Sequence, residues 1–438
     1  MAFDQTAFPQ PRFSGPFAVQ ILCARPYRCR TAAEGGCLPA KVVMVDAMRL
    51  RVAAVLVLLI GGYLGFNYFI RPIPAVGAVA SIPASTTIDG SAPAMPWPSA
   101  GSAAIGVSGL GLIESSGRET PAPAAGLAKV MTALVVLEDK PLKGGDPGPS
   151  VAITDADVQA YQADSANHQN VVAVQSGEQL SEFHALQGLL IPSADNIATT
   201  LARWDAGSVD AFVAEMNKRA DALGMTHTRF ADESGASAKT TSTPSDLVKL
   251  GLVAMKQPVL AQIVAQSQAN IPVAGTVRNL DTALGQSGII GIATGNGDFL
   301  YAASETLGDF TVTLFGCVMG LNSLDSAFTA AKTLIAAMRP VVKVGRVLYK
   351  DKIVGSYELP WGDHTDLFAT DNVDLVEWPG MVLREIVHAP ALTVTQPIDP
   401  GTTEGALHIT LGGYTLDISL TTVDGLYPPG KFWKLLRI

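Results

Sequence analysis

The sequence predicts an α+β protein with three parts: a membrane-spanning helix, a domain of mixed helices and strands, and a smaller all-β domain. Three observations support this prediction. Residues 52–70 are apolar and uncharged, strand patterns flank a run of helical patterns between residues 102 and 338, and short alternating strands follow Pro340. Neither helices alone nor strands alone account for these patterns.

The composition excludes several classes of protein. With 438 residues, of which 48% are hydrophobic and 16% charged, the chain can form two or three packed domains and is not disordered. A net charge of −9 without a cluster of lysines and arginines argues against a nucleic-acid partner. We expect no metal and no cofactor, because the histidines lack the H-E-x-x-H spacing and the glycine-rich residues 106–111 lack a following Gly-Lys-Ser/Thr.

The N-terminal part is expected to contain one membrane anchor. Residues 1–47 show no periodicity, and we interpret them as a disordered cytoplasmic segment or as the product of a start assigned too early. Residues 48–71 form the predicted transmembrane helix. Because Arg49 and Arg51 precede the apolar run, the positive-inside rule places the N-terminus in the cytoplasm and the main domains outside. A cleaved signal peptide is the alternative, although the apolar run is longer than the usual h-region.

Residues 72–100 are rich in Pro, Ala, Ser and Gly and carry almost no charge. Such a segment cannot bury enough apolar surface to become ordered by itself. We expect it to be a tether between the membrane and the main domain, residues 101–340.

The main domain is expected to pack helices against a mainly antiparallel sheet. Strands are predicted at 103–112, 289–294, 299–304 and 310–318. Helices are predicted at 127–138, 154–161, 180–204 (interrupted by a loop at 191–196), 209–223, 242–255 and 327–338. Residues 341–438 are expected to form a separate β-rich domain with a hairpin over 407–420 and a closing strand in its last eight residues.

The segment on which the functional interpretation depends is the helix predicted around Lys129. Apolar residues recur at three- and four-residue steps, and Lys129 lies beside them in the first turn, with no other charge before Glu138. One interpretation is a side chain that extends its amine into water along the apolar surface. The other is a lysine held at the floor of a cleft, where it can act as a base.

The run from Pro123 to Glu138 resembles the nucleophile helix of the serine D-alanyl-D-alanine carboxypeptidases, the low-molecular-mass penicillin-binding proteins. Their first motif is S-x-x-K. Lys129 matches its lysine, and Gly126 stands in the place of its serine. The resemblance extends over about three quarters of the chain, including the β-rich domain, with connecting segments in the family's order at 223–230, 233–235 and 242–247.

The other two motifs are also altered. The family's S-x-N motif corresponds to Ser193 through Asp195, and Asn196 does not simply replace the lost asparagine, because a shift by one residue turns the side chain by about 100 degrees. The K-T-G motif corresponds to Ala293, Thr294 and Gly295, so its lysine is missing.

The resemblance implies a penicillin-binding-protein/β-lactamase-like transpeptidase domain and an acyl transfer in which serine attacks the bond between two terminal D-alanines. The family positions implied as catalytic are Gly126, Lys129, Ser193 and Asp195, and those implied for substrate binding are Ala293, Thr294 and Gly295. The local formal charge falls from about +2 in the family to about 0 here. We therefore expect an inactive relative that binds peptidoglycan stem peptides or a cell-wall enzyme.

Two further expectations concern the same residues. Lys129 and Asp195 are expected to form a buried ion pair, in which each removes the cost of an uncompensated charge on the other. The alternative to an inactive protein is a hydrolase that uses Ser193 as a relocated nucleophile with Lys129 as its base, since a Ser-Lys dyad suffices on other folds. A third interpretation is a relic with only a structural role.

Overall fold

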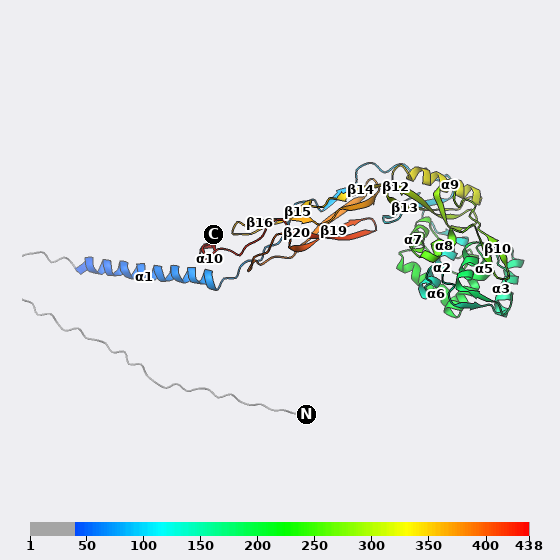
Figure 1. The fold of residues 1–438 in the computed structure, drawn as a ribbon, viewed down its shortest axis with the longest axis horizontal. Helices are drawn as coiled ribbons and strands as arrows, with labels where there is room; N and C mark the ends of the chain where they lie inside the picture. The colour runs from blue at the N-terminus through cyan, green and yellow to red at the C-terminus, as the bar shows by residue number, and fades with distance from the viewer. Residues whose placement is uncertain (1–39, 438) are drawn as a thin grey trace, which may run out of the picture. The chain divides into compact units, whose positions relative to one another are not determined.

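A computed structural model describes residues 40–437, which form two compact units (Figure 1). The first unit contains helix α1 (Ala40–Phe69) and the residues from Lys434 onward. Residues 47–69 of α1 are long and apolar enough to span a membrane. The side chain of Asn67 donates to the Leu435 carbonyl at 3.2 Å, so the C-terminal residues contact the end of this helix.

Helix α1 begins earlier than the sequence analysis predicted. Residues 40–47, which we assigned to an unstructured segment, form its first turns, and the remaining residues 1–39 lie outside the described part of the chain. The reason is local. From Ala40 to Met48 the sequence has neither Gly nor Pro, so nothing interrupts the helix on the N-terminal side of the apolar run.

The second unit contains the main domain, which is built on an antiparallel sheet of five strands in the order β11-β12-β13-β3-β4. Their bounds are β11 Ile289–Thr294, β12 Phe299–Leu307, β13 Phe310–Met319, β3 Ser102–Val107 and β4 Gly111–Ser115. The single strand predicted at 103–112 is wrong. It is a hairpin, in which Gly109 and Gly111 adopt positive φ values of 81° and 90° that let the chain reverse.

Helices cover both faces of this sheet, which confirms the predicted α+β class. Along β12, Leu300 and Ala302 face the core under the helices α2 to α8, whereas Phe299, Tyr301 and Ala303 face α9. The bounds are α2 Lys129–Asp139, α3 Asp155–Ala166, α4 Glu182–Leu190, α5 Asp195–Ala206, α6 Val209–Ala222, α7 Pro244–Ala254, α8 Pro258–Val264 and α9 Leu324–Met338. Helix α2 is the centre of the larger core, because its residues 129–137 are all buried.

Side chains cap the starts of several helices. Thr154 forms a capping box with Asp157 at the start of α3, and Thr243 caps α7 ahead of its first-turn proline. Gly224 follows α6 with φ at 66° and ends it. Three short two-stranded sheets complete the domain: β5 Ala122–Pro123 with β8 Thr241–Ser242, β6 Ser150–Ala152 with β7 Gln179–Ser181, and β9 Gln268–Ile271 with β10 Gly275–Arg278.

The C-terminal part is all-β, as predicted, until its last element. A seven-stranded sheet has the order β1-β15-β16-β20-β19-β18-β2, and a separate pair joins β14 to β17. The bounds are β14 Lys343–Leu348, β15 Ile353–Glu358, β16 His364–Ala369, β17 Val373–Glu377, β18 Val382–His388, β19 Thr403–Leu411 and β20 Tyr414–Thr422. The predicted hairpin is the pair β19 and β20, which turns at Gly412 and Gly413.

The final element is the short helix α10 (Lys431–Leu436), so the predicted closing strand is wrong. This segment contains no β-branched residue and no glycine, and both facts favour a helical turn once the two prolines and the glycine before it have ended the preceding chain.

The expected tether is ordered in the structure, which corrects that prediction. β1 (Val79–Ala80) pairs with β15, β2 (Ser85–Thr87) pairs with β18, and Met95 is 7% exposed. The segment supplies both outer strands of the seven-stranded sheet. Its composition prevents independent folding, but the open edges of β15 and β18 offer backbone partners that the segment itself lacks.

We predict that a chain beginning at Pro72 is more stable than one beginning at Gly101. Burial of a methionine side chain such as Met95 alone stabilises a fold by about 1.5–3 kcal/mol. Urea unfolding followed by circular dichroism measures the difference. Equal free energies of unfolding for the two chains would show that residues 72–100 contribute no stability.

Candidate functional site

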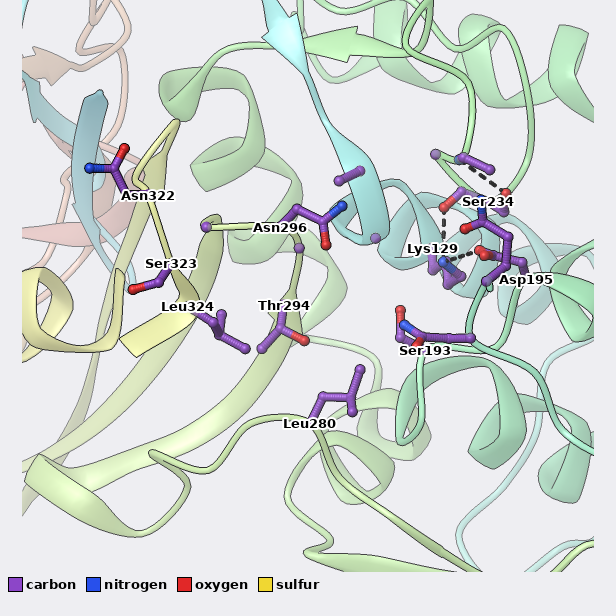
Figure 2. A pocket seen from close by; sticks show the side chains of 18 residues that line it. Lys129, Ser193, Asp195, Ser234, Leu280, Thr294, Asn296, Asn322, Ser323 and Leu324 are labelled. Atoms are coloured by element: carbon purple, nitrogen blue, oxygen red, sulfur yellow. Dashed lines mark hydrogen bonds and ion pairs between the residues drawn. The ribbon is translucent and has the colours of Figure 1, made fainter. Parts of the chain in front are cut away.

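A cavity of about 590 Å³ opens between the start of α2, the start of α5 and strand β11. It brings together six of the seven residues singled out in the sequence, and Figure 2 shows Lys129 and Asp195 on one side with Thr294 on the other. The six that line it are Gly126, Lys129, Ser193, Asp195, Thr294 and Gly295. Ala293, the position of the missing motif lysine, is not among the lining residues.

Lys129 is held at the floor of this cavity. Its side chain is buried at the start of α2, with the residue 3% exposed, so it does not extend along the surface into water. Nζ lies 2.6 Å from Asp195 Oδ1 and donates to the Ser234 carbonyl at 3.0 Å (Figure 2). The predicted ion pair is confirmed, and both contacts use the amine as a donor.

The backbone at the start of α5 positions Asp195. Its N–H donates to the Asn170 carbonyl at 2.7 Å, and its carboxylate lies in the first turn of α5, where the helix dipole favours a negative charge. Asn196 faces elsewhere. Its side chain forms two hydrogen bonds with the backbone of Val172, so it does not replace the lost motif asparagine.

Gly126 has no space for a side chain. An ideally placed Cβ would lie 2.5 Å from the Thr294 carbonyl oxygen and 2.9 Å from Ser193 Oγ. The first of these neighbours is backbone of β11, so any side chain at residue 126 requires this strand to move. The preceding Ala125 has φ at 46° and is itself packed tightly, since a Cβ at Gly235 would lie 1.8 Å from the Ala125 carbonyl oxygen.

Ser193 lies close to the position where a side chain of residue 126 would begin, but it is not paired with Lys129. It adopts φ at 57°, an uncommon value for a serine, and faces Gly126 from the loop before α5. Within the described part of the chain no hydrogen bond joins Ser193 Oγ to Lys129 Nζ, whose partners are Asp195 and Ser234. A nucleophile and its base need hydrogen-bond contact, so the described geometry does not contain a Ser193–Lys129 dyad.

Three more carboxyl groups lie close to lining residues without lining the cavity themselves, and the sequence analysis assigned none of them a role. Burial, reinforced by the charge of Asp195, raises the pKa of Asp164, and Lys129 partly opposes this. Burial also raises the pKa of Glu233, whose side chain accepts a hydrogen bond from Thr199. Burial raises the pKa of Asp298 to about 6, although Gly320 N–H donates to it at 2.7 Å.

The rest of the lining is largely neutral and polar. Hydroxyl and amide side chains reach it from loops that are far apart in sequence, and only Ser234 lies in a segment that the sequence analysis named: Gln169, Asn170, Ser234, Asn296, Asn322 and Ser323. These groups can donate and accept hydrogen bonds without carrying charge. No spacing in the sequence identifies them, because only the fold brings the loops together.

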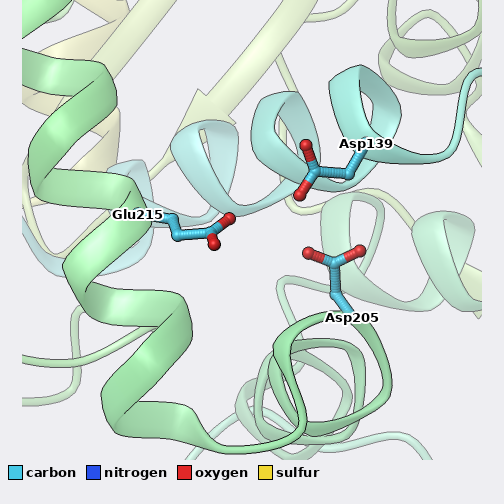
Figure 3. Close-up of side chains that lie close together, drawn as sticks. All are labelled: Asp139, Asp205 and Glu215. Carbon is cyan, nitrogen blue, oxygen red and sulfur yellow. The ribbon is translucent and has the colours of Figure 1, made fainter.

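Among the described residues, one group of carboxylates lies close enough to share a cation. Oxygen atoms of Asp139, Asp205 and Glu215 lie within 4.8 Å of one another, and Figure 3 shows the three side chains pointing toward a common centre. Burial and the neighbouring carboxylates raise the pKa of Glu215. The ammonium of Lys140 already pairs with Asp205, so part of the negative charge is compensated within the chain. This group does not belong to the cavity described above.

Sequence comparisons identify relatives of the main domain. Residues 108–299 match the family model described as D-alanyl-D-alanine carboxypeptidase. The D-alanyl-D-alanine carboxypeptidase DacB2 of Mycobacterium tuberculosis is 35% identical over 153 residues, which are 34% of this chain and 48% of that protein. A D-alanyl-D-alanine endopeptidase of Pseudomonas aeruginosa is 34% identical over 142 residues, 32% of this chain and 42% of that protein. The matched segments thus cover less than half of either relative.

Structural comparison gives the same fold over a longer part of the chain. Penicillin binding protein 5 of Haemophilus influenzae superimposes with a TM-score of 0.57 at 17% identity, covering 78% of this chain and all of that one. The D-alanyl-D-alanine carboxypeptidase DacD of Francisella tularensis gives a TM-score of 0.55 at 16% identity, covering 76% and 95%. The fold is therefore that of the penicillin-binding proteins, preceded by an apolar helix.

We predict that Asp195→Asn destabilises the protein by about 3–5 kcal/mol, because it leaves the Lys129 ammonium buried without a counter-charge. Guanidinium unfolding measures the change. Asp309→Asn, at an exposed turn residue, is the matched control and should change the free energy of unfolding little. If Asp195→Asn lowers the free energy of unfolding no more than Asp309→Asn does, the ion pair does not compensate a buried charge.

We predict that Gly126→Ala costs about 1–3 kcal/mol, because the new methyl group overlaps the Thr294 carbonyl and overpacks the site. Gly144→Ala is the control, since a Cβ there meets no atom within 4 Å. The comparison uses thermal unfolding of the two variants and the parent. If Gly126→Ala lowers the thermal stability no more than Gly144→Ala does, β11 moves freely away from α2.

Proposed function

Because its residues 108–299 place this chain in the D-alanyl-D-alanine carboxypeptidase family of the low-molecular-mass penicillin-binding proteins, we propose that it is a non-catalytic member. It acts in peptidoglycan metabolism by binding stem peptides, or a partner cell-wall enzyme, without hydrolysing the peptide. One observation carries this proposal. The position of the family's nucleophile is Gly126, and the Thr294 carbonyl occupies the space that a side chain there needs.

The state of the lysine supports the same proposal. In a serine acyl transferase the lysine must accept the proton of the attacking hydroxyl, and this requires hydrogen-bond contact between the two groups. Here the Lys129 amine donates to Asp195 and to the Ser234 carbonyl instead. Loss of the nucleophile alone reduces the rate of related serine hydrolases by many powers of ten.

The proposal places the cleft outside the cytoplasm. Helix α1 is the anchor, and Arg49 and Arg51 precede its apolar run, which favours a cytoplasmic N-terminus under the positive-inside rule. The main domain then faces the cell wall. Its cavity is open to peptides there, and the polar side chains that line it can bind peptide backbone.

A second candidate function is a hydrolase that uses Ser193. The observation that favours it is the position of Ser193 Oγ, which lies 2.9 Å from the place where a Cβ of residue 126 would be. This hydroxyl is therefore near the site of the family nucleophile. It lacks the contact with Lys129 that would activate it, and we rank this function below simple binding.

We predict that the purified full-length protein forms no covalent adduct with a fluorescent penicillin and releases no D-alanine from diacetyl-lysyl-D-alanyl-D-alanine. Gly126→Ser is expected to stay unlabelled as well, because the new hydroxyl meets the Thr294 carbonyl and a lysine already engaged by Asp195. Gel fluorescence and a D-alanine assay measure both activities. Labelling that disappears in Ser193→Ala would support the relocated nucleophile and overturn the proposal.

Retention on purified peptidoglycan sacculi tests the binding part of the proposal. The full-length protein in detergent should sediment with the sacculi, and an excess of soluble stem peptide should release it. Failure to sediment would limit the function to contact with a partner enzyme.

A further inference from the structure

The cleft has lost the positive charge that would hold a free peptide carboxylate. Lys129 is the one cation among its lining residues, and it is paired with Asp195 at 2.6 Å. Ala293, on β11 beside Thr294, has no charge to contribute. A terminal carboxylate that enters the cavity therefore finds no unpaired ammonium or guanidinium among the residues that line it.

The groups that lie just behind the lining are carboxyl groups and not cations. Asp164 is close enough to Asp195 and Lys129 for both charges to act on its carboxyl group. Asp298 is 5% exposed, and its carboxylate lies 3.1 Å from the position of a Cβ on Gly295 in the cavity wall. The Lys129 ammonium is thus paired with Asp195 and also interacts with the charge of Asp164.

The surface that a ligand meets is nevertheless suited to peptide groups. Side-chain amides of Asn170, Asn296 and Asn322 and hydroxyls of Ser193 and Ser323 line the cavity, and Figure 2 shows Asn296 and Ser193 on opposite sides of it. Amides and hydroxyls pair with neutral peptide N–H and C=O groups as both donors and acceptors. They compensate an entering negative charge far less well than an ammonium or guanidinium does.

We propose that this cleft binds a peptide whose C-terminal end is uncharged, such as a C-terminal carboxamide, in preference to the same peptide with a free carboxylate. This inference rests on the proposed function, because it assigns the ligand class of the same site. A carboxylate would find no unpaired cation among the lining residues and would approach the Asp298 carboxylate behind the wall, whereas a carboxamide can pair with the amides and hydroxyls that line the cavity. A peptide whose chain continues beyond the cleft likewise brings no terminal carboxylate into it.

The test compares two probes on the full-length protein in detergent: diacetyl-L-lysyl-D-alanyl-D-alanine and its C-terminal carboxamide. Isothermal titration calorimetry gives both dissociation constants at neutral pH. We expect the carboxamide to bind about tenfold more tightly. The difference should narrow as salt is raised, because salt screens the repulsion of the carboxylate. Equal affinities, tighter binding of the free carboxylate, or no binding of either probe at millimolar concentration would each overturn the inference.

A charge variant separates the local effect from net charge. Asn296→Lys adds an ammonium to a side chain that lines the cavity and should reduce or reverse the preference for the carboxamide. Ala214→Lys adds the same charge on the exposed side of α6, away from the lining residues, and should leave the preference unchanged. If both variants shift the preference equally, the effect belongs to the charge of the whole protein and the inference fails.

The two proposals fail in different ways. Hydrolysis or penicillin labelling refutes the non-catalytic function whichever probe binds better. Retention on sacculi together with a preference for the free carboxylate refutes the ligand class and leaves the proposed function intact.

Discussion

The buried ion pair between Lys129 and Asp195 is the constraint on which the site depends. An isolated ammonium at the floor of this cavity would be costly, and an isolated carboxylate equally so, but at 2.6 Å each compensates the other. The two residues begin the two helices α2 and α5, so the pair also fixes how these helix starts face each other. The same contact that stabilises the site engages the amine that an acyl-transfer mechanism would need free.

Gly126 and the ion pair each oppose the family's acyl-transfer chemistry, one by a steric and the other by an electrostatic effect. At Gly126 the limit is steric, because the carbonyl of Thr294 on β11 lies where a side chain would begin. At Lys129 the limit is electrostatic, because the carboxylate that replaces the family's neutral amide holds the ammonium. Restoring either group alone leaves the other limit in place, so the proposed non-catalytic function rests on two independent features of the site.

The ordered segment before the main domain illustrates how context overrides composition. Residues 72–100 contain too little apolar surface to fold by themselves, yet they supply β1 and β2 at the two edges of the seven-stranded sheet. The free N–H and C=O groups of β15 and β18 provide what the segment lacks, and in return the sheet has its exposed edges covered.

The sequence by itself determined the elements whose cause is local. Apolar periodicity was sufficient for most helices of the main domain, although α8 was not predicted and α10 was predicted as a strand. Of the seven residues that the family motifs placed near the cleft, six line it. The sequence also predicted the ion pair, because a buried lysine and a buried carboxylate at neighbouring motif positions require each other. Only the tertiary structure decided the features set by contacts between distant segments. These are the closure of β11 over Gly126, the carboxyl groups of Asp164 and Asp298 around the cavity, and the pairing of residues 72–100. Each depends on which backbone edge or loop lies opposite, and neither spacing nor composition carries that information.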